Sequence, residues 1–184
     1  MSDFNGSLRK RKNLKPNIIL LSVLFFIFLA FPFGFLFYVI FQGRSDVWYS
    51  PNLIFIIGLF ILVLIFKEVI RVGIWTALDR EVDFVDFRVS LRQTVTFVYN
   101  TKVTRMSAYR LGILLPGLIL GVALILYSFL SANLYMLAAG IFALSTSLKD
   151  AVIFISLLRE KPDSLIEDPV NEPYCYILEE EISA

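Results

Sequence analysis

The sequence predicts an α-helical polytopic membrane protein with about four transmembrane helices and a small strand-rich cytoplasmic loop between helices two and three. Hydrophobic residues make up 58% of the 184-residue chain, and the mean hydropathy is +0.75, far above the values of ordinary soluble domains. Apolar residues gather in four long stretches. Lys and Arg gather in the segments that an even number of crossings would bring to one side.

Residues 1–16 are polar and contain five cations, so we expect a basic cytoplasmic N-terminus. The first span is predicted over 17–41; it is too long for the apolar core of a cleaved signal peptide, and no small-x-small cleavage site follows it. The net charge of the whole chain is only +1. This balance gives no global attraction to nucleic acid, and we expect no nucleic-acid partner.

The second span is predicted over 52–78. Its uninterrupted apolar part ends at Phe66, which is too short to cross a bilayer, so the helix must continue through Lys67, Glu68 and Arg71. A charge at the centre of a membrane helix costs roughly 2.5–3.5 kcal/mol on insertion scales. Such a charge normally has a partner or a function. The alternative is that Lys67 and Arg71 extend to the headgroups.

Residues 79–110 form the loop before the third span. From Val85 to Tyr99 apolar residues mostly alternate with polar ones, which is typical of strands. We expect one or two amphipathic strands at the membrane surface. They would either hold an extended peptide by adding it as a further strand or form a structural hairpin. Six cations make the loop positive, which places it on the cytoplasmic side.

The third and fourth spans are predicted over 111–129 and 132–158, with a tight connection around residues 131–133. Residues 159–184 are polar, with three prolines and an acidic end, and form a predicted cytoplasmic tail. The expected organisation is one membrane domain over 17–158 with both termini in the cytoplasm. The expected location is a bacterial cytoplasmic membrane.

Asp150 in the fourth span lies at nearly the depth of Lys67. From Asn52 to Lys67 is roughly 22 Å of helix, and from Ala132 to Asp150 roughly 27 Å. Both positions fall in the inner third of a core about 30 Å thick. Asp150 therefore meets the face shared by Lys67 and Arg71 if the two helices pack together.

Lys67-Glu68-Val69-Ile70-Arg71 keeps the glutamate of a His-Glu-x-x-His zinc helix and replaces both histidines by cations. The chain has no histidine and one cysteine, Cys175. The stretch from about Leu53 to Leu178 resembles a family of small bacterial membrane proteins classed as zincin peptidases and related to site-2-protease-type zinc metallopeptidases. Further segments match the motifs of that family: Tyr109-Arg110, Leu115-Pro116-Gly117, Leu120-Gly121, Leu157-Leu158-Arg159, Pro162 and Asp168-Pro169. The resemblance implies the fold and makes Asp150 the counterpart of the third zinc ligand.

The charges of Lys67, Glu68, Arg71 and Asp150 sum to zero, as they do for zinc with two neutral histidines, a glutamate and an aspartate. We therefore expect a degenerate, non-catalytic relative, a pseudoenzyme in which cations have replaced the metal. It would bind or regulate a membrane polypeptide and hold neither zinc nor another cofactor. Two alternatives stay open: an intramembrane hydrolase using the Glu68 and Asp150 carboxylates, and a small transporter-like protein with charges along its path.

Overall fold

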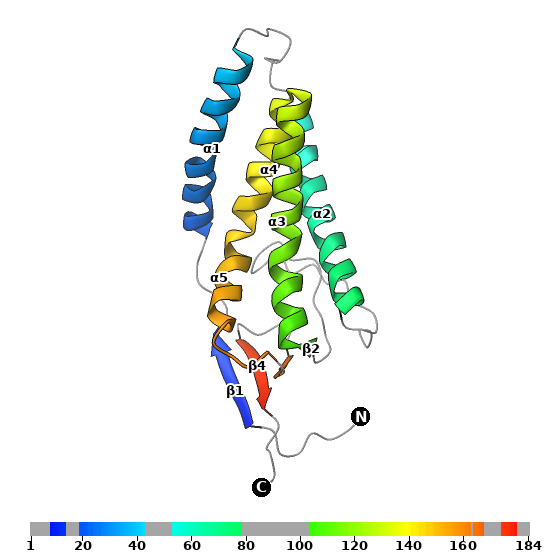
Figure 1. Cartoon of the computed structure of the whole chain (residues 1–184). Helices are drawn as coiled ribbons and strands as arrows, with labels where there is room; N and C mark the ends of the chain where they lie inside the picture. Colours follow the sequence, from blue (N-terminus) through cyan, green and yellow to red (C-terminus); the bar gives the residue numbers. More distant parts are fainter. Residues whose placement is uncertain are drawn as a thin grey trace. The chain divides into compact units, whose positions relative to one another are not determined.

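The computed structural model describes residues 8–13, 19–42, 53–78, 104–162, 164–167 and 174–179 (Figure 1). The described chain separates into two compact units. Unit 1 contains residues 1–16, 71–113 and 153–184. Unit 2 contains residues 17–70 and 114–152. Each unit has its own buried side chains, and each is considered separately below.

Five helices account for most of the described residues: α1 (Ile19–Phe41), α2 (Leu53–Leu78), α3 (Met106–Ser131), α4 (Leu134–Thr146) and α5 (Leu148–Leu157). The first three, and α4 with α5 as one segment, are long and apolar enough to cross a membrane. The predicted class is therefore confirmed at this level. The helical bounds also agree with the predicted spans, except that α3 begins at Met106 rather than near residue 111.

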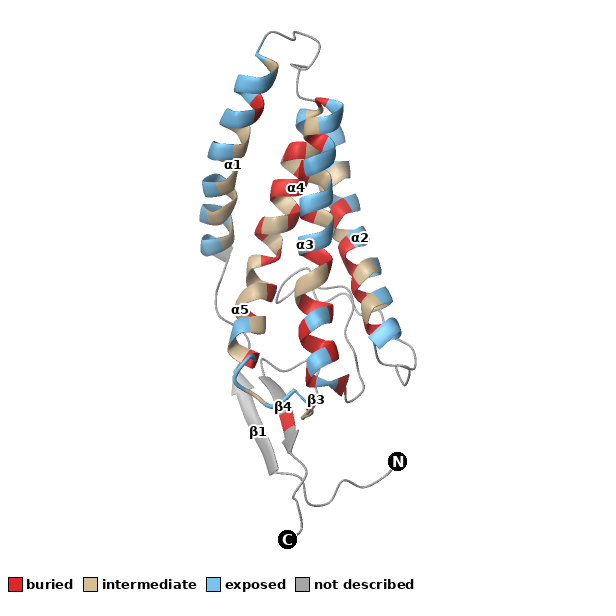
Figure 2. Cartoon of the chain, viewed as in Figure 1, coloured by how far each residue is buried: buried red, intermediate tan, exposed pale blue. Residues whose placement is uncertain are grey.

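In unit 2, α4 is the central helix, because it packs against three others. Phe37 of α1 and Ile125 of α3 share a buried cluster with Leu137 and Ile141 of α4. A second cluster joins Val63 of α2 to α4. Figure 2 shows the consequence: α1 presents a mostly exposed surface, whereas buried positions recur along α4. The exposed apolar face of α1 suits contact with lipid.

Two glycines allow α3 and α4 to approach closely. A Cβ atom at Gly140 would lie 2.9 Å from the backbone oxygen of Gly121, and one at Gly121 would lie 3.2 Å from the backbone oxygen of Gly140. Small residues at such crossings let helix backbones meet in the membrane. The expected tight connection after α3 is also present, with Ala132 at φ 52° and Asn133 capping α4 by accepting hydrogen bonds from the amides of Tyr135 and Met136.

Unit 1 contains a four-stranded antiparallel sheet with the order β1-β4-β3-β2. The strands are β1 (Leu8–Asn13), β2 (Thr104–Arg105), β3 (Leu165–Glu167) and β4 (Tyr174–Glu179). The register pairs Leu8 with Glu179 and Asn13 with Tyr174. The sheet thus joins a segment before α1, one immediately before α3 and two after α5.

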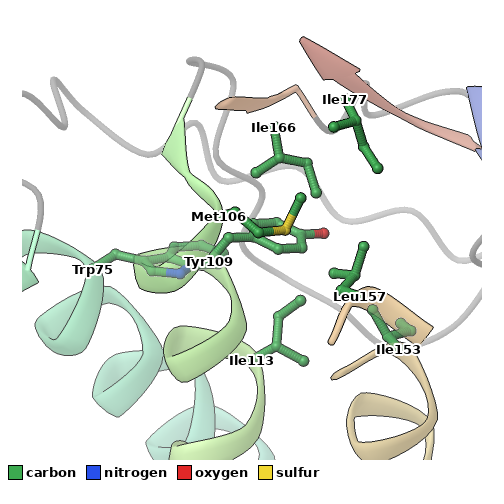
Figure 3. Close-up of a cluster of buried hydrophobic side chains, with 8 residues drawn as sticks. All are labelled: Trp75, Met106, Tyr109, Ile113, Ile153, Leu157, Ile166 and Ile177. Carbon is green, nitrogen blue, oxygen red and sulfur yellow. The ribbon is translucent and has the colours of Figure 1, made fainter. Parts of the chain in front are cut away.

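A hydrophobic core lies between this sheet and the helix ends of unit 1 (Figure 3). Ile166 of β3 and Ile177 of β4 point toward Met106 and Leu157, and all four side chains are at most 1% exposed. The first turn of α3 is too polar for hydropathy to mark it as membrane-spanning. It is helical because this core buries it.

Two predictions need qualification. Residues 1–16 and 159–184 were expected as a basic terminus and a tail, yet both carry strands, and these strands pair with each other. The predicted strands between residues 85 and 99 lie outside the described residues, as does the short connection at 43–52. Of the predicted strand-rich loop over 79–110, the structure describes β2, which pairs with β3, and residues 106–110, which belong to α3.

Candidate functional site

The four charged residues singled out from the sequence are all buried. Lys67, Glu68, Arg71 and Asp150 are each at most 9% exposed. In unit 2, the Nζ atom of Lys67 lies 2.7 Å from the Oδ2 atom of Asp150. This distance confirms the pairing that helix depth predicted. It also overturns, for Lys67, the alternative of a side chain extended to the headgroups.

The lysine has a second partner on the backbone. Lys67 Nζ donates a hydrogen bond to the carbonyl oxygen of Thr146 at 3.2 Å. Thr146 is the last residue of α4, and Asp150 lies in the first turn of α5. The ammonium group therefore sits at the junction of two helices. It donates a hydrogen bond to a carbonyl at the end of α4, where carbonyl groups lack partners within the helix. It also pairs with a carboxylate at the start of α5, where the helix dipole favours negative charge.

The predicted fourth span over 132–158 is present as one apolar segment, Leu134–Leu157, and Ser147 separates α4 from α5 within it. Three consecutive hydroxyl residues precede α5, and each donates back to a carbonyl three or four residues earlier. Ser145 bonds the Ile141 oxygen, and both Thr146 and Ser147 bond the Ala143 oxygen. Such bonds compete with the regular helical pattern and bend helices. The amide of Ser147 bonds the carbonyl of Leu144, three residues back, which tightens the final turn of α4.

Gly117 of α3 makes room for this arrangement. A Cβ atom at Gly117 would lie 1.6 Å from the Ser147 hydroxyl and 3.5 Å from the Cε atom of Lys67. Any larger residue would therefore displace the Ser147 side chain. The Pro116-Gly117 pair, quoted above as a sequence motif, thus brings α3 against the junction between α4 and α5.

The other two predicted site residues lie on the same helix as Lys67. Glu68 is its direct neighbour in unit 2, and Arg71 follows one turn after Lys67 but belongs to unit 1. Helical spacing puts Lys67 and Arg71 on one face and Glu68 within reach of Arg71. Both Glu68 and Arg71 take part in polar or electrostatic interactions. The structure therefore brings Lys67 and Asp150 into direct contact, while Glu68 and Arg71 are buried close to Lys67 on α2.

These residues do not form a suitable zinc site. Structural and catalytic zinc sites use thiolates, imidazoles and carboxylates, whereas a protonated lysine or an arginine offers no lone pair. Here the ammonium group of Lys67 already pairs with the Asp150 carboxylate, which is the group that would have to act as a metal ligand. Among the described residues, no cluster of three or more His, Cys, Asp or Glu side chains is placed to hold a metal ion.

Sequence reasoning missed three participants: the Thr146 carbonyl, the Ser147 hydroxyl and Gly117. The run Ser145-Thr146-Ser147, immediately before a charged pair in an apolar segment, is the signal that marks the junction. No comparable signal marks a backbone carbonyl, because every residue has one.

Comparisons with known proteins return no similarity. No family model matches the chain, and no curated protein or solved structure matches it either.

Proposed function

We propose that this chain is a non-catalytic integral membrane protein in which an internal cation occupies the position that a metal holds in membrane zinc peptidases. Its role is to bind or regulate a membrane polypeptide. The observation that supports this proposal best is the contact between Lys67 Nζ and Asp150 Oδ2. The carboxylate that the resemblance equates with a zinc ligand is engaged by a side chain of the same protein.

The same contact disfavours the hydrolase alternative. A pair of carboxylates activates water by sharing one proton between them. In this chain the Oδ2 atom of Asp150 pairs with the ammonium group of Lys67, and the Thr146 carbonyl accepts a hydrogen bond from the same group. Asp150 is therefore arranged as the partner of a cation rather than as one half of an acid pair.

The sheet of unit 1 supports the proposed orientation, in which both termini lie on one side of the membrane. β1 precedes α1, β2 lies between α2 and α3, and β3 and β4 follow α5. Segments that pair in one sheet must lie on the same side, which requires an even number of crossings between them. The basic residues of β1 favour the cytoplasmic side. This orientation is tested by labelling: a cysteine introduced by Ser2→Cys in a Cys175→Ser background should react from the cytoplasm, and one introduced by Ser45→Cys from outside.

The test of the site is a reconstruction of the metal centre. The double variant Lys67→His, Arg71→His removes the internal cation and gives α2 two imidazoles four residues apart around Glu68. We expect elemental mass spectrometry to find about one zinc per chain in the double variant and almost none in the unchanged protein. Adding Asp150→Asn should then abolish zinc binding by the double variant.

Two controls make the result decisive. The variant Lys67→Gln, Arg71→Gln removes the same charges without supplying imidazoles and should bind no zinc. Stoichiometric zinc in the unchanged protein, lost on Asp150→Asn, would overturn the proposal. A double variant that stays folded by circular dichroism but binds no zinc would remove its connection to zinc peptidases.

A further inference from the structure

The last carbonyl group of α4 is bonded by a side chain rather than by the backbone of a following turn. In a continuous α-helix, the Thr146 carbonyl would accept a hydrogen bond from the amide of Asp150, four residues later. Because Ser147 separates α4 from α5, the regular pattern stops before this bond. The Thr146 carbonyl accepts from the Nζ atom of Lys67 instead, at 3.2 Å.

The Ala143 carbonyl shows the same exchange of partner. In a continuous helix it would accept from the Ser147 amide, but that amide donates to the Leu144 carbonyl at 3.1 Å. The Ala143 carbonyl accepts from the hydroxyl groups of Ser147 and Thr146, at 2.7 and 3.0 Å. The interruption is therefore accompanied by side-chain donors. Lys67 differs from the two hydroxyl residues because it comes from another helix.

The ammonium group of Lys67 contacts both sides of the interruption. It donates to the last residue of α4, and it lies 2.7 Å from the Oδ2 atom of Asp150 in the first turn of α5. Both side chains are buried, and α4 with α5 forms one of the apolar segments long enough to cross a membrane. In lipid no water replaces a lost donor. If the ammonium group is withdrawn, the Thr146 carbonyl must therefore find another donor within the protein.

The backbone can supply that donor after a small rotation. Ser147 has φ −88° and ψ −6°, whereas an α-helix has φ of about −63° and ψ of about −42°. The two conformations differ by about 25° in φ and about 36° in ψ, and both have the negative φ and ψ of right-handed helical backbone. Closing the interruption would bring the amide of residue 150 to the Thr146 carbonyl, as in any continuous helix.

We propose that Lys67 is a latch that keeps α4 and α5 apart at Ser147, and that the segment closes into one helix when the ammonium group is withdrawn. The two forms differ in the donor to the Thr146 carbonyl: Lys67 Nζ in the latched form, and the amide of residue 150 in the closed form. An element with two discrete arrangements is the usual basis of a conformational switch. Any contact that withdraws Lys67 therefore changes the helix that carries Asp150. The proposal does not depend on the resemblance to zinc peptidases.

One peptide group reports on the state of the junction. Thr146-Ser147 is the only Thr-Ser dipeptide in the sequence. Protein labelled with ¹³C at the threonine carbonyl and with ¹⁵N in serine therefore gives a single carbonyl–amide correlation in an NMR spectrum recorded in detergent micelles. The carbonyl ¹³C shift moves downfield when the residue becomes helical and its oxygen accepts a backbone hydrogen bond. The shift of Thr146 thus distinguishes the latched form from the closed form.

A matched pair of variants isolates the ammonium group. Both carry Asp150→Asn, so neither leaves a buried carboxylate without its cation. In Lys67→Met, Asp150→Asn, we expect the Thr146 carbonyl shift to move downfield to the value of a helix interior. Asp150→Asn alone retains the nitrogen that donates to the Thr146 carbonyl, so we expect the shift of the unchanged protein. Circular dichroism establishes that each variant is folded. If the first double variant does not fold, Lys67→Leu, Asp150→Leu replaces it, with the same expected shift.

Four outcomes would overturn the proposal. An unchanged carbonyl shift in the folded double variant would show that the hydroxyl residues alone keep the helix interrupted. An upfield movement would show that the carbonyl loses its donor and gains no amide. An equal downfield movement in Asp150→Asn alone would assign the latch to the carboxylate. Failure of both double variants to fold would show that no closed form replaces the latched one. No imidazole or zinc enters this test, so its failure is distinct from a failure of the metal reconstruction.

Discussion

Within the described residues, two helix ends are each bonded by a cation from another helix, and they differ in the other groups that the cation contacts. In unit 2, Lys67 bonds the last carbonyl of α4 and the Asp150 carboxylate. In unit 1, Arg110 bonds two carbonyl oxygens at the end of α5, those of Leu157 and Glu160. The first cation has an acid partner deep in an apolar segment. The second is bonded to backbone oxygens beside the sheet.

The comparison shows how a hydrophobic chain uses buried cations. The final carbonyls of a helix lack partners within the helix, and in lipid no water replaces them. A cation near a helix C-terminus also interacts favourably with the dipole. The arrangement around Arg110 is reciprocal, because the amides of Met106 and Ser107 at the start of α3 donate to the carbonyls of Ser164 and Pro162.

The largest expected effect is at the first of these ends. Lys67→Met leaves the buried Asp150 carboxylate without its cation, and breaking a buried pair from one side costs about 3–5 kcal/mol. We expect a loss of this size in the free energy of unfolding, measured by detergent-titrated unfolding in mixed micelles. The double variant Lys67→Met, Asp150→Leu should recover much of it, because it leaves no unpaired charge.

This pair of variants also separates a structural lock from a functional site. If Lys67→Met and Asp150→Leu were each mild and their effects simply added, the two side chains would not be coupled. The comparison with Arg110 would then rest on the wrong contact.

A smaller effect is expected at the second end. Arg110→Met removes the donors to the Leu157 and Glu160 carbonyls, and a hydrogen bond to a charged group contributes about 1.5–3 kcal/mol. The expected loss in unfolding free energy is of that size, measured in the same way. Arg159→Gln is the matched control, because Arg159 is exposed, and surface changes usually fall within about 0.5 kcal/mol. Equal losses for the two variants would argue that Arg110 contributes only its charge.

The contrast between the two ends also separates what the sequence reveals from what it does not. The contact of Lys67 with Asp150 was predicted because helix rise converts residue counts into depth, and charges at equal depth need partners. Arg110 was noticed only as part of a motif and a positive loop. Its carbonyl partners have no signature in the sequence.

The sheet shows the same limit. β4 contains β-favouring residues, but β1 has a single apolar residue, Leu8, and no alternation. The pairing of Leu8 with Glu179 joins positions at opposite ends of the chain. Strand pairing depends on such distant partners far more than on local preference. Hydropathy could therefore locate the spans, while the sheet beside them could not be predicted.

A glycine variant tests the packing around the first end. Gly117→Ala places a Cβ atom 1.6 Å from the Ser147 hydroxyl, so Ser147 must move from its bond to the Ala143 carbonyl. Overpacking of this kind typically costs about 1–3 kcal/mol. Gly58→Ala in α2 is the control, since a Cβ there meets nothing within 4 Å and should gain up to about 1 kcal/mol of helix propensity. If both variants gained stability, the close approach of α3 to the junction would be refuted.

The smallest effect concerns the start of α4, which a neutral side chain caps. The Asn133 Oδ1 atom accepts from the amides of Tyr135 and Met136 at 3.0 and 3.3 Å. Asn133→Ala should cost about 1 kcal/mol, the usual value for losing such a cap, while Asn133→Ser should retain most of it. The measured order Lys67→Met, then Arg110→Met, then Asn133→Ala would show that the cost of opening a helix end follows the charge buried there. If Asn133→Ala lowered the free energy of unfolding as much as Lys67→Met, the cost of opening a helix end would depend on the unpaired backbone groups alone.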